Sequence, residues 1–379
     1  MPSCSSTTQA IRIDLGDYIM ADFYEIDFLP VGTTKSGDAI CLRYEINNHI
    51  YTHVVDGGYE ENGQSVLDHL SDYYNGNKID HVVATHPDGD HAVGLRTVLE
   101  QAQVGALWMN RPWIHAQELL PYFAKYTNAE SLAKALRDVF PNLAKLEDIA
   151  VERGIPIHDA YQGAQIGAFT VLAPSRAAIF NYVADDIRTP KVASETTTRG
   201  GMFDGAVQVI AEGLRLIMAA WGAEKFPADD TSPRNNMSIV QFADFSGEKV
   251  VLTADAGRAA LDEAATYAPF VGLPLPANEI RLIQVPHHGS RHNVSTETLD
   301  RWLGEVGEEH HESRSNAIVS AGKDDLDHPR KVVVRAFMQR GATVGETKGR
   351  SLCFSGGEAP GRAGWVSNTP LSYPTGYEE

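Results

Sequence analysis

Apolar residues near the start of the chain form short runs that alternate with polar residues. Residues 19–29, 38–46 and 51–55 mix β-branched and aromatic side chains with polar ones, and Gly and Asn separate the runs. Alternation with a period of two is typical of strands that bury one face. The pattern therefore predicts an antiparallel meander of three strands.

After this meander the apolar spacing alternates between the period of a helix and that of a strand. Val66, Leu67 and Leu70 lie at helical spacing within residues 65–74, and residues 79–84 return to a strand pattern. The first half continues with a helix at 92–103, a strand at 106–109, a helical region at 114–153 broken at Pro141, and strands at 164–173. The second half has strand patterns at 237–242, 249–254, 280–285, 317–320 and 342–344, with helices at 261–267 and 331–340.

Both halves thus share one scheme, in which strands end abruptly and are followed by helices or loops. We expect an α/β fold in which two sheets pack together with helices outside. We also expect a single domain over residues 1–379, with pseudo-symmetric halves at about 1–175 and 200–362. The stretch 175–235 is irregular and polar, which favours either a flexible lid or a harmless insertion.

Composition narrows the class of protein. The 379 residues are 43% hydrophobic and 22% charged, with no long apolar run, which is typical of a soluble globular protein without a membrane span. The first ten residues lack the basic and apolar regions of a secretory signal, and the three cysteines are far apart, so we expect a cytoplasmic protein. The net charge of −18 would repel nucleic acid, but residues 281–362 are nearly balanced in charge, which permits a nucleic-acid substrate.

The densest chemistry lies in the loop T-H-P-D-G-D-H-A-V-G-L, residues 85–95. It places four metal-ligand types within six residues, directly after a strand: His86, Asp88, Asp90 and His91. The alternative is a solvated loop that caps the next helix, with Asp90 as the N-cap. Two histidines that flank two aspartates favour a metal centre.

Three further strand ends carry similar residues. Asp255 ends the apolar run V-V-L-T-A-D, His287 and His288 end L-I-Q-V-P-H-H, and His328 follows A-I-V-S-A-G. An α/β scaffold gathers a site from distant parts of the sequence at such ends. The alternatives are a helix cap or a buried structural histidine for the pair, and a surface histidine before a proline for His328.

Imidazole and carboxylate ligands suit Zn²⁺ or Mn²⁺. Two such ions, about 3.5–4 Å apart, would hold a bridging hydroxide and stabilise the attacking and leaving oxygens of a displacement. The sequence therefore predicts a hydrolase with two divalent metal ions, and Asp90, His287 and His328 are its candidate catalytic residues.

At this point the motifs resemble those of a known family. T-H-P-D-G-D-H is similar to the metal loop of the metallo-β-lactamase superfamily, usually H-x-H-x-D-H, and Asp255 is similar to its bridging aspartate. Asp88 in place of the second histidine, together with R-N-N-M-S-I-V, L-T-A-D, V-P-H-H-G-S and D-H-P, resembles the hydrolase domain of the competence protein ComEC/Rec2 and its soluble relatives. The resemblance implies a four-layer αββα sandwich.

The resemblance also implies roles for individual residues. His86 and Asp88 would bind one ion, Asp90 and His91 the other, and Asp255 would bridge them. His288, with His287 beside it, would complete the second ion or protonate the leaving group. Residues implied or suggested to contact substrate oxygens or phosphate are Asn235, Asn236, Ser290, Arg291 and Lys348; a turn before the strand is an equally good role for the two asparagines.

Two departures from the family pattern concern this site. Ala254 replaces the usual glycine before the bridging aspartate, and no obvious histidine stands at the third motif unless His158 fills it. The first ion would then be held less conventionally, or only one ion would bind tightly.

Three functions remain open. The first is a phosphodiesterase or nuclease that acts on DNA, without the transmembrane channel of the competence proteins; as the effector of a multi-gene defence system it would have protein partners. The second is a small-molecule hydrolase that cleaves a lactone, thioester, β-lactam or small phosphoester. The third is a degenerate metal-binding module, which the intact ligand set disfavours.

Overall fold

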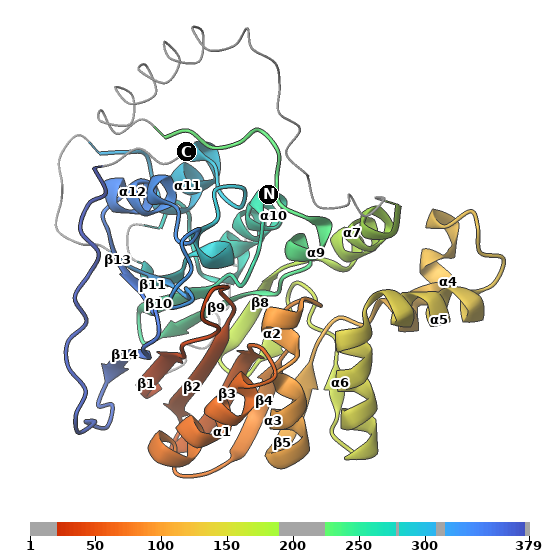
Figure 1. Cartoon of the computed structure of the whole chain (residues 1–379), viewed down its shortest axis with the longest axis horizontal. Helices are drawn as coiled ribbons and strands as arrows, with labels where there is room; N and C mark the ends of the chain where they lie inside the picture. The colour runs from red at the N-terminus through yellow and green to blue at the C-terminus, as the bar shows by residue number, and fades with distance from the viewer. Residues whose placement is uncertain (1–20, 189–223, 278–279, 308–314, 376–379) are drawn as a thin grey trace, which may run out of the picture.

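The computed structural model describes residues 21–188, 224–277, 280–307 and 315–375 of the chain. Two seven-stranded sheets face each other, and helices cover the outer face of each sheet (Figure 1). The α/β prediction and the four-layer αββα sandwich are therefore confirmed.

The first sheet has the order β14-β1-β2-β3-β4-β5-β6. Strands β14, β1, β2 and β3 pair antiparallel, as the meander predicted, and β3 to β6 pair parallel. The strands are β1 (Ala21–Phe28), β2 (Ala39–Ile46), β3 (His49–Gly57), β4 (Lys78–Val83), β5 (Gln103–Trp108), β6 (Ile157–His158) and β14 (Leu352–Gly357).

The second sheet has the order β13-β12-β11-β10-β9-β8-β7. Strands β10 to β13 pair parallel, and β9, β8 and β7 continue the sheet antiparallel. The strands are β7 (Gln165–Ile166), β8 (Phe169–Ala173), β9 (Val240–Phe245), β10 (Glu248–Leu252), β11 (Ile280–Gln284), β12 (Ser315–Val319) and β13 (Ala342–Glu346).

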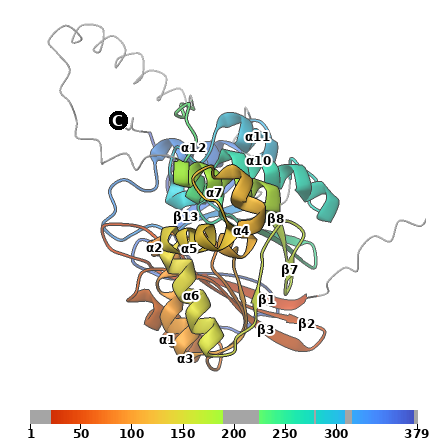
Figure 2. The same ribbon diagram turned by 90° about the vertical axis from the view of Figure 1, so that its right-hand side faces the viewer.

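Helices form the outer layers. In Figure 1, α1, α3 and α6 lie below the first sheet, and α10, α11 and α12 lie above the second; Figure 2 shows the same layers from the side. The outer helices are α1 (Asn62–Tyr73), α3 (Leu95–Gln101), α6 (Pro141–Glu152), α10 (Arg258–Tyr267), α11 (Thr296–Leu303) and α12 (Lys331–Gln339). The remaining helices within the described residues are α2 (Gly89–Ala92), α4 (Ala116–Leu119), α5 (Ala129–Val139), α7 (Arg176–Arg188) and α9 (Pro233–Asn236), with 3₁₀ turns η1 (Pro112–His115), η2 (Leu120–Tyr122), η3 (Ala268–Val271) and η4 (Pro286–Gly289).

Three apolar cores correspond to the three interfaces between the layers. One core lies between the first sheet and its helices and contains Val54, Val82 and Leu99. A second lies between the second sheet and its helices and contains Val251 and Phe337. The third lies between the two sheets and is rich in aromatic rings, such as Tyr44, Phe169 and Phe245. Each sheet buries alternate side chains on its two faces. This packing holds the two sheets face to face and keeps the ends of their strands in place.

Local sequence explains several boundaries. Pro141 occupies the first turn of α6, where its missing N–H costs nothing, so the long helical region breaks there as expected. Helix α5 begins at Asn128, whose side chain accepts a hydrogen bond from the Ser131 N–H. The strands expected at 164–173 form a hairpin of β7 and β8.

The structure differs from the sequence-based expectations for the stretch 175–235 and for the division of the chain into two halves. Helix α7 lies inside the stretch expected to be irregular, and residues 189–223 of the proposed lid or insertion lie outside the described residues. Strands β7 and β8 belong to the second sheet and β14 to the first, so the sheets do not coincide with halves at 1–175 and 200–362. The single-domain description stays a prediction. No helix in the described ranges is long and apolar enough to cross a membrane.

Candidate metal centre

The candidate ligands lie where strands of both sheets end. The loop that carries His86 and Asp88 follows β4, and α2 carries Asp90 and His91. Asp255 follows β10, while His287 and His288 lie in η4 directly after β11. Because parallel strands present their carboxyl ends at the same edge of a sheet, residues far apart in sequence meet there.

The carboxylate of Asp255 lies at the centre of the group. Its Oδ1 is 3.3 Å from Nε2 of His91 and 3.5 Å from Nε2 of His288. Its Oδ2 is 3.7 Å from Nε2 of His86 and 3.5 Å from Nε2 of His287. Each oxygen of Asp255 therefore faces its own pair of histidines.

The two remaining carboxylates complete these two groups. Oδ2 of Asp88 lies 3.9 Å from Nε2 of His86. Oδ2 of Asp90 lies 3.9 Å from Nε2 of His288 and 4.0 Å from Nε2 of His91. Asp90, His91 and His288 form one compact set of possible ligands. The structure thus brings together all six predicted ligands: His86, Asp88, Asp90, His91, Asp255 and His288.

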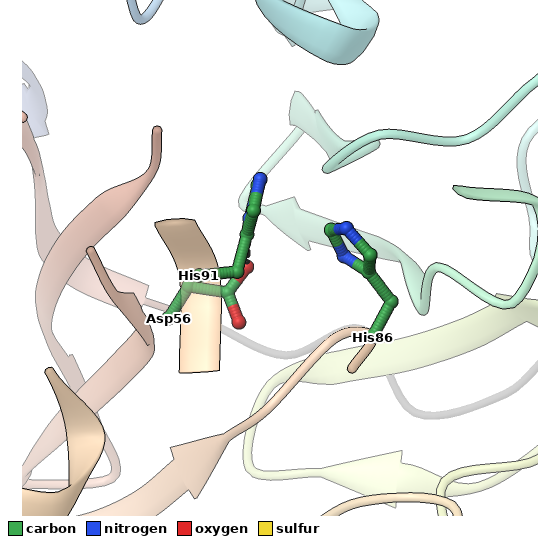
Figure 3. A group of neighbouring side chains, drawn as sticks. All are labelled: Asp56, His86 and His91. Carbon is green, nitrogen blue, oxygen red and sulfur yellow. Dashed lines mark hydrogen bonds and ion pairs between the residues drawn. The ribbon is translucent and has the colours of Figure 1, made fainter. Parts of the chain in front are cut away.

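Hydrogen bonds at the opposite ring nitrogens orient the histidines. Nδ1 of His86 lies 3.0 Å from Oγ1 of Thr85, and Nδ1 of His91 lies 2.9 Å from Oδ2 of Asp56. Nδ1 of His288 lies 2.9 Å from the carbonyl oxygen of Ser320. An oxygen partner at Nδ1 fixes the tautomer that leaves Nε2 free to bind a metal. Figure 3 shows the rings of His86 and His91 side by side, with Asp56 next to His91.

The atoms that face the centre have no partner within the described part of the chain. Nε2 of His86, His91 and His288 and Oδ1 of Asp255 are buried without a hydrogen bond. Leaving such groups unpaired is costly, whereas a divalent cation would satisfy all four. Imidazole and carboxylate donors in this arrangement fit Zn²⁺ or Mn²⁺. The site therefore fits the metal ions that the sequence predicted.

Charge in the site is strongly negative before any ion binds. Burial alone would raise the pKa of Asp255, but His287 and His91 hold it well below the usual value. Burial opposes a charge on His91, yet Asp255 and Asp56 raise its pKa well above the usual value. Burial lowers the pKa of His288 to about 4. A proton on His91 therefore partly balances the carboxylates, and a metal ion would replace it.

Backbone conformation near the centre is strained. His287 and His288 have φ of 46° and 56°, and Ala254 has φ of 46°. Such left-handed conformations cost of order 1–3 kcal/mol for residues other than glycine. At position 254 the strain explains why glycine is the expected residue before the aspartate. The strained residues meet directly, because the N–H of His287 donates to the carbonyl of Ala254 at 3.0 Å.

His328 lies beside the histidine pair. Its ring centroid is 6.1 Å from that of His287 and 6.2 Å from that of His288. Its Nδ1 lies 3.1 Å from Oδ2 of Asp325, and this carboxylate also accepts a hydrogen bond from Ser36. His328 is thus fixed next to the centre without lying among the ligands.

The residues expected to contact substrate have varied surroundings. Nδ2 of Asn235 donates to Thr231 and lies 3.1 Å from Nδ1 of His287. The Asn236 amide bonds to Asp230 and to the backbone N–H groups of Gly257 and Ala260, where α10 begins. Its side-chain donors and acceptors are therefore engaged within the protein.

The other three expected substrate contacts lie in two loops. Ser290 is buried and Arg291 is half-buried, both directly after η4. Nζ of Lys348 donates to the carbonyl of Asp325 at 3.0 Å, which ties it to the loop that carries His328.

Sequence reasoning missed two buried aspartates of the site. Asp56 accepts hydrogen bonds from both Thr85 and His91, and Asp38 lies within 3.7 Å of Nδ1 of His91. Asp56 ends β3 just before Gly57-Gly58, which is the same strand-end signal that identified Asp255. His158 does not fill the gap at the third motif, because it lies in the edge strand β6 and packs against Trp108.

A small apolar hollow adjoins His86. It is lined mainly by apolar side chains from the metal loop, η1, α6, α7 and the segment before β9: Pro87, Pro112, Leu143, Ile179 and Met237. The wall of the site on the His86 side is therefore partly apolar.

Comparisons with known proteins agree with this architecture. The model of the metallo-beta-lactamase superfamily matches residues 46–159, a segment that includes the metal loop. No curated protein matches the chain significantly.

The matches among solved structures include the following three. The metallo-beta-lactamase fold protein YhfI from Bacillus subtilis is 11% identical, with a TM-score of 0.40 over 88% of this chain and 100% of that chain. A putative metallo-beta-lactamase from Thermotoga maritima is 10% identical, with a TM-score of 0.27 over 61% and 78%. An N-acyl homoserine lactone hydrolase is 9% identical, with a TM-score of 0.28 over 67% and 89%.

Proposed function

We propose that this protein is a metal-dependent hydrolase that acts on phosphodiesters, as a nuclease on DNA. The observation that carries the proposal is the division of the ligands around the carboxylate of Asp255. Histidine and aspartate ligands lie on both sides of it, His86 with Asp88 on one side and His91 and His288 with Asp90 on the other. This arrangement suits two divalent ions that share one carboxylate. Two ions together are the usual device for in-line displacement at phosphorus.

Six residues are proposed to hold the ions. His86 and Asp88 bind the first, Asp90, His91 and His288 bind the second, and Asp255 bridges them. When bound, Zn²⁺ or Mn²⁺ ions supply a water molecule activated near neutral pH and stabilise negative charge on the reacting group. Asp90, which is partly exposed, is the carboxylate placed to orient that water.

The protein itself must supply a proton to the leaving oxygen. His328 suits this role, because Asp325 holds its Nδ1 at 3.1 Å and the ring lies beside the histidine pair. His287 is the alternative donor. We propose that Asn235, Ser290, Arg291 and Lys348 contribute contacts to substrate oxygens. The Asn236 amide, which is engaged with Asp230 and the start of α10, would instead hold its own loop in place.

Motifs favour a phosphodiester substrate over a carbonyl one. Asp88 stands where most members of the superfamily have a second histidine, and H-H-G-S and D-H-P are typical of the ComEC-like branch. We therefore propose that the protein is related to the soluble members of that branch. We further propose a cytoplasmic role with protein partners in a multi-gene defence system.

A second candidate function has its own observation. The net charge of −18 would repel nucleic acid, which favours a small substrate instead. The alternative is thus a small-molecule hydrolase that opens a lactone, thioester or β-lactam, or cleaves a small phosphoester.

One set of assays separates the two functions. Protein loaded with Mn²⁺ or Zn²⁺ is incubated with linear DNA, circular DNA, bis(4-nitrophenyl) phosphate, an acyl lactone and a chromogenic β-lactam. We expect cleavage of the phosphodiesters and its loss in Asp90→Asn. Turnover of the lactone or lactam alone would replace the nuclease proposal with the second function.

A further inference from the structure

We propose that His287 is a ligand of the first metal ion, so that the adjacent residues His287 and His288 each serve a different ion. The inference rests on the proposed two-ion function. His287 would take the ligand position of the histidine that the third motif of the superfamily usually supplies, since this chain has no histidine ligand at that motif.

The first argument is distance. Nε2 of His287 lies 3.5 Å from Oδ2 of Asp255, and this oxygen also faces Nε2 of His86 at 3.7 Å. Nε2 of His288 instead lies 3.5 Å from Oδ1 of Asp255, on the side of His91. The two neighbouring histidines therefore approach opposite oxygens of one carboxylate.

The second argument is the tautomer of His287. Its Nδ1 lies 2.8 Å from Oδ1 of Asn293. The orientation of the Asn293 amide is fixed, because its Nδ2 donates to the carbonyl oxygens of Asp255 and Ala256. Oδ1 of Asn293 must then accept the proton of Nδ1, which leaves the Nε2 lone pair free for a metal.

Asn235 does not reverse this assignment. Its Nδ2 lies 3.1 Å from the same ring nitrogen, farther than Oδ1 of Asn293 at 2.8 Å. One of the two Asn235 amide hydrogens is donated to Oγ1 of Thr231 at 2.9 Å. The shorter contact, made by the amide whose two hydrogens are both engaged, therefore decides the tautomer of His287.

The third argument is the backbone of the H-H-G turn. His287, His288 and Gly289 have consecutive positive φ angles of 46°, 56° and 83°. Two successive histidines in this conformation are costly, so the fold holds them there by the bonds from His287 N–H to Ala254 and from Ser290 N–H to His287. The turn places the two rings 5.6 Å apart with planes 67° apart, which lets each reach its own side of Asp255.

The fourth argument is the composition of the first group. Without His287, that group contains one histidine, His86, and two carboxylates, Asp88 and Asp255. With His287 it has two imidazoles and two carboxylates, which matches the second group of His91, His288, Asp90 and Asp255. His287 is 28% exposed, so the first group also stays open to a substrate.

Metal occupancy tests the proposal directly. Asparagine tolerates positive φ, so His287→Asn preserves the turn while it removes the imidazole. Crystals of wild type, His287→Asn and His288→Asn are soaked with Zn²⁺, and anomalous scattering gives the occupancy on each side of Asp255. Chelator competition in solution gives the two dissociation constants, and thermal unfolding without metal checks each fold.

We expect wild type to bind two ions. In crystals of His287→Asn the site beside His86 should lose its ion, and in solution that ion should bind at least about tenfold more weakly. His288→Asn should instead weaken the binding of the ion beside His91. His292→Ala is the matched control, because His292 lies in the same loop and contacts Asp229 instead of Asp255.

The outcomes separate the inference from the proposed function. Two ions of unchanged affinity in His287→Asn would overturn the ligand role and leave His287 as a proton donor. Wild-type protein that binds no ion, or only one, would instead remove the two-ion function on which the inference rests.

Discussion

Nδ1 of His91 lies 2.9 Å from Oδ2 of Asp56, which is fully buried. The same oxygen of Asp56 accepts a 2.6 Å hydrogen bond from the hydroxyl of Thr85, and Thr85 lies 3.0 Å from Nδ1 of His86. One buried carboxylate at the end of β3 therefore orients two histidines on opposite sides of Asp255.

Replacing this carboxylate tests its orienting role. In Asp56→Asn the amide nitrogen cannot accept the protons of His91 and Thr85, so both rings lose their fixed tautomers. We expect metal binding to weaken about 10- to 100-fold. Asp80→Asn is the matched control, since Asp80 also accepts a backbone N–H, that of Thr52, but lies apart from the ligands. Equal affinities in the two variants, measured by chelator competition, would refute the role.

Arg234 provides a second test outside the ligands themselves. Its Nη1 lies 3.8 Å from Oδ1 of Asp88, while Nε binds Asp186 of α7 at 3.0 Å and the guanidinium lies over the ring of Phe140. Arg234 therefore holds the outer oxygen of Asp88 and leaves Oδ2 to face His86. We expect Arg234→Met to weaken the binding of one of the two ions by about tenfold.

The control for Arg234 is another arginine with similar chemistry. Arg137 pairs with Glu147 and Asp148 and lies over the ring of Trp113, and none of these is a proposed ligand. Arg137→Met should leave both dissociation constants unchanged in the same titration. If both arginine variants bind metal like wild type, Arg234 has no part in the site.

Metal binding should compete with protons. In the metal-free protein Asp255 and Asp56 hold the pKa of His91 well above its usual value, although burial opposes the charge. His91 is then protonated at neutral pH, and an ion must displace that proton. We expect the apparent affinity to fall by about tenfold per pH unit on acidification, with about one proton released. Titration calorimetry in buffers of different ionisation enthalpy measures this, and pH-independent binding would contradict it.

Asp38 should reduce the stability of the metal-free protein at high pH. Burial, with the nearby charge of Asp255, raises its pKa to about 7, against the pull of His91. The penalty of burying its charge is therefore absent below about pH 4, grows as the pH rises, and is complete above pH 7. Asp38→Asn should unfold at a higher temperature than wild type at pH 8, with an advantage of at most about 4 kcal/mol.

The pH dependence is the control for Asp38. The amide oxygen of asparagine can still accept the 2.8 Å hydrogen bond from Gln284, so the packing is preserved. The advantage of Asp38→Asn should shrink to less than half at pH 5 and disappear below about pH 4. An advantage of equal size at both pH values, or a less stable variant at pH 8, would contradict the buried charge.

Much of the fold follows from the sequence because each sheet buries one face on helices and the other on its partner sheet. The period-two runs at β1, β2 and β3 and the strand ends at β4, β10 and β11 were all visible in the sequence. Helix α7 was not, because Pro174 and the polar stretch that follows it masked a helical pattern whose apolar face, with Ile179 and Val183, is short.

The ligands were predictable because metal-ligand side chains are rare at the ends of buried strands. The supporting residues were not, because Asp56, Asn293 and Arg234 act through hydrogen bonds that form only when both sheets are assembled. The division of His287 and His288 between the two oxygens of Asp255 depends on backbone angles that no residue pattern reveals.

The central claim is that two divalent ions bind on the two sides of Asp255, and metal stoichiometry tests it most directly. Protein stripped with chelator is titrated with Zn²⁺ and with Mn²⁺, and bound metal is counted by mass spectrometry for wild type and Asp255→Asn. Two ions per chain in wild type, and a marked loss of both affinities in Asp255→Asn, are the predicted result. Fewer than two ions in wild type, or undiminished binding in Asp255→Asn, would contradict the claim.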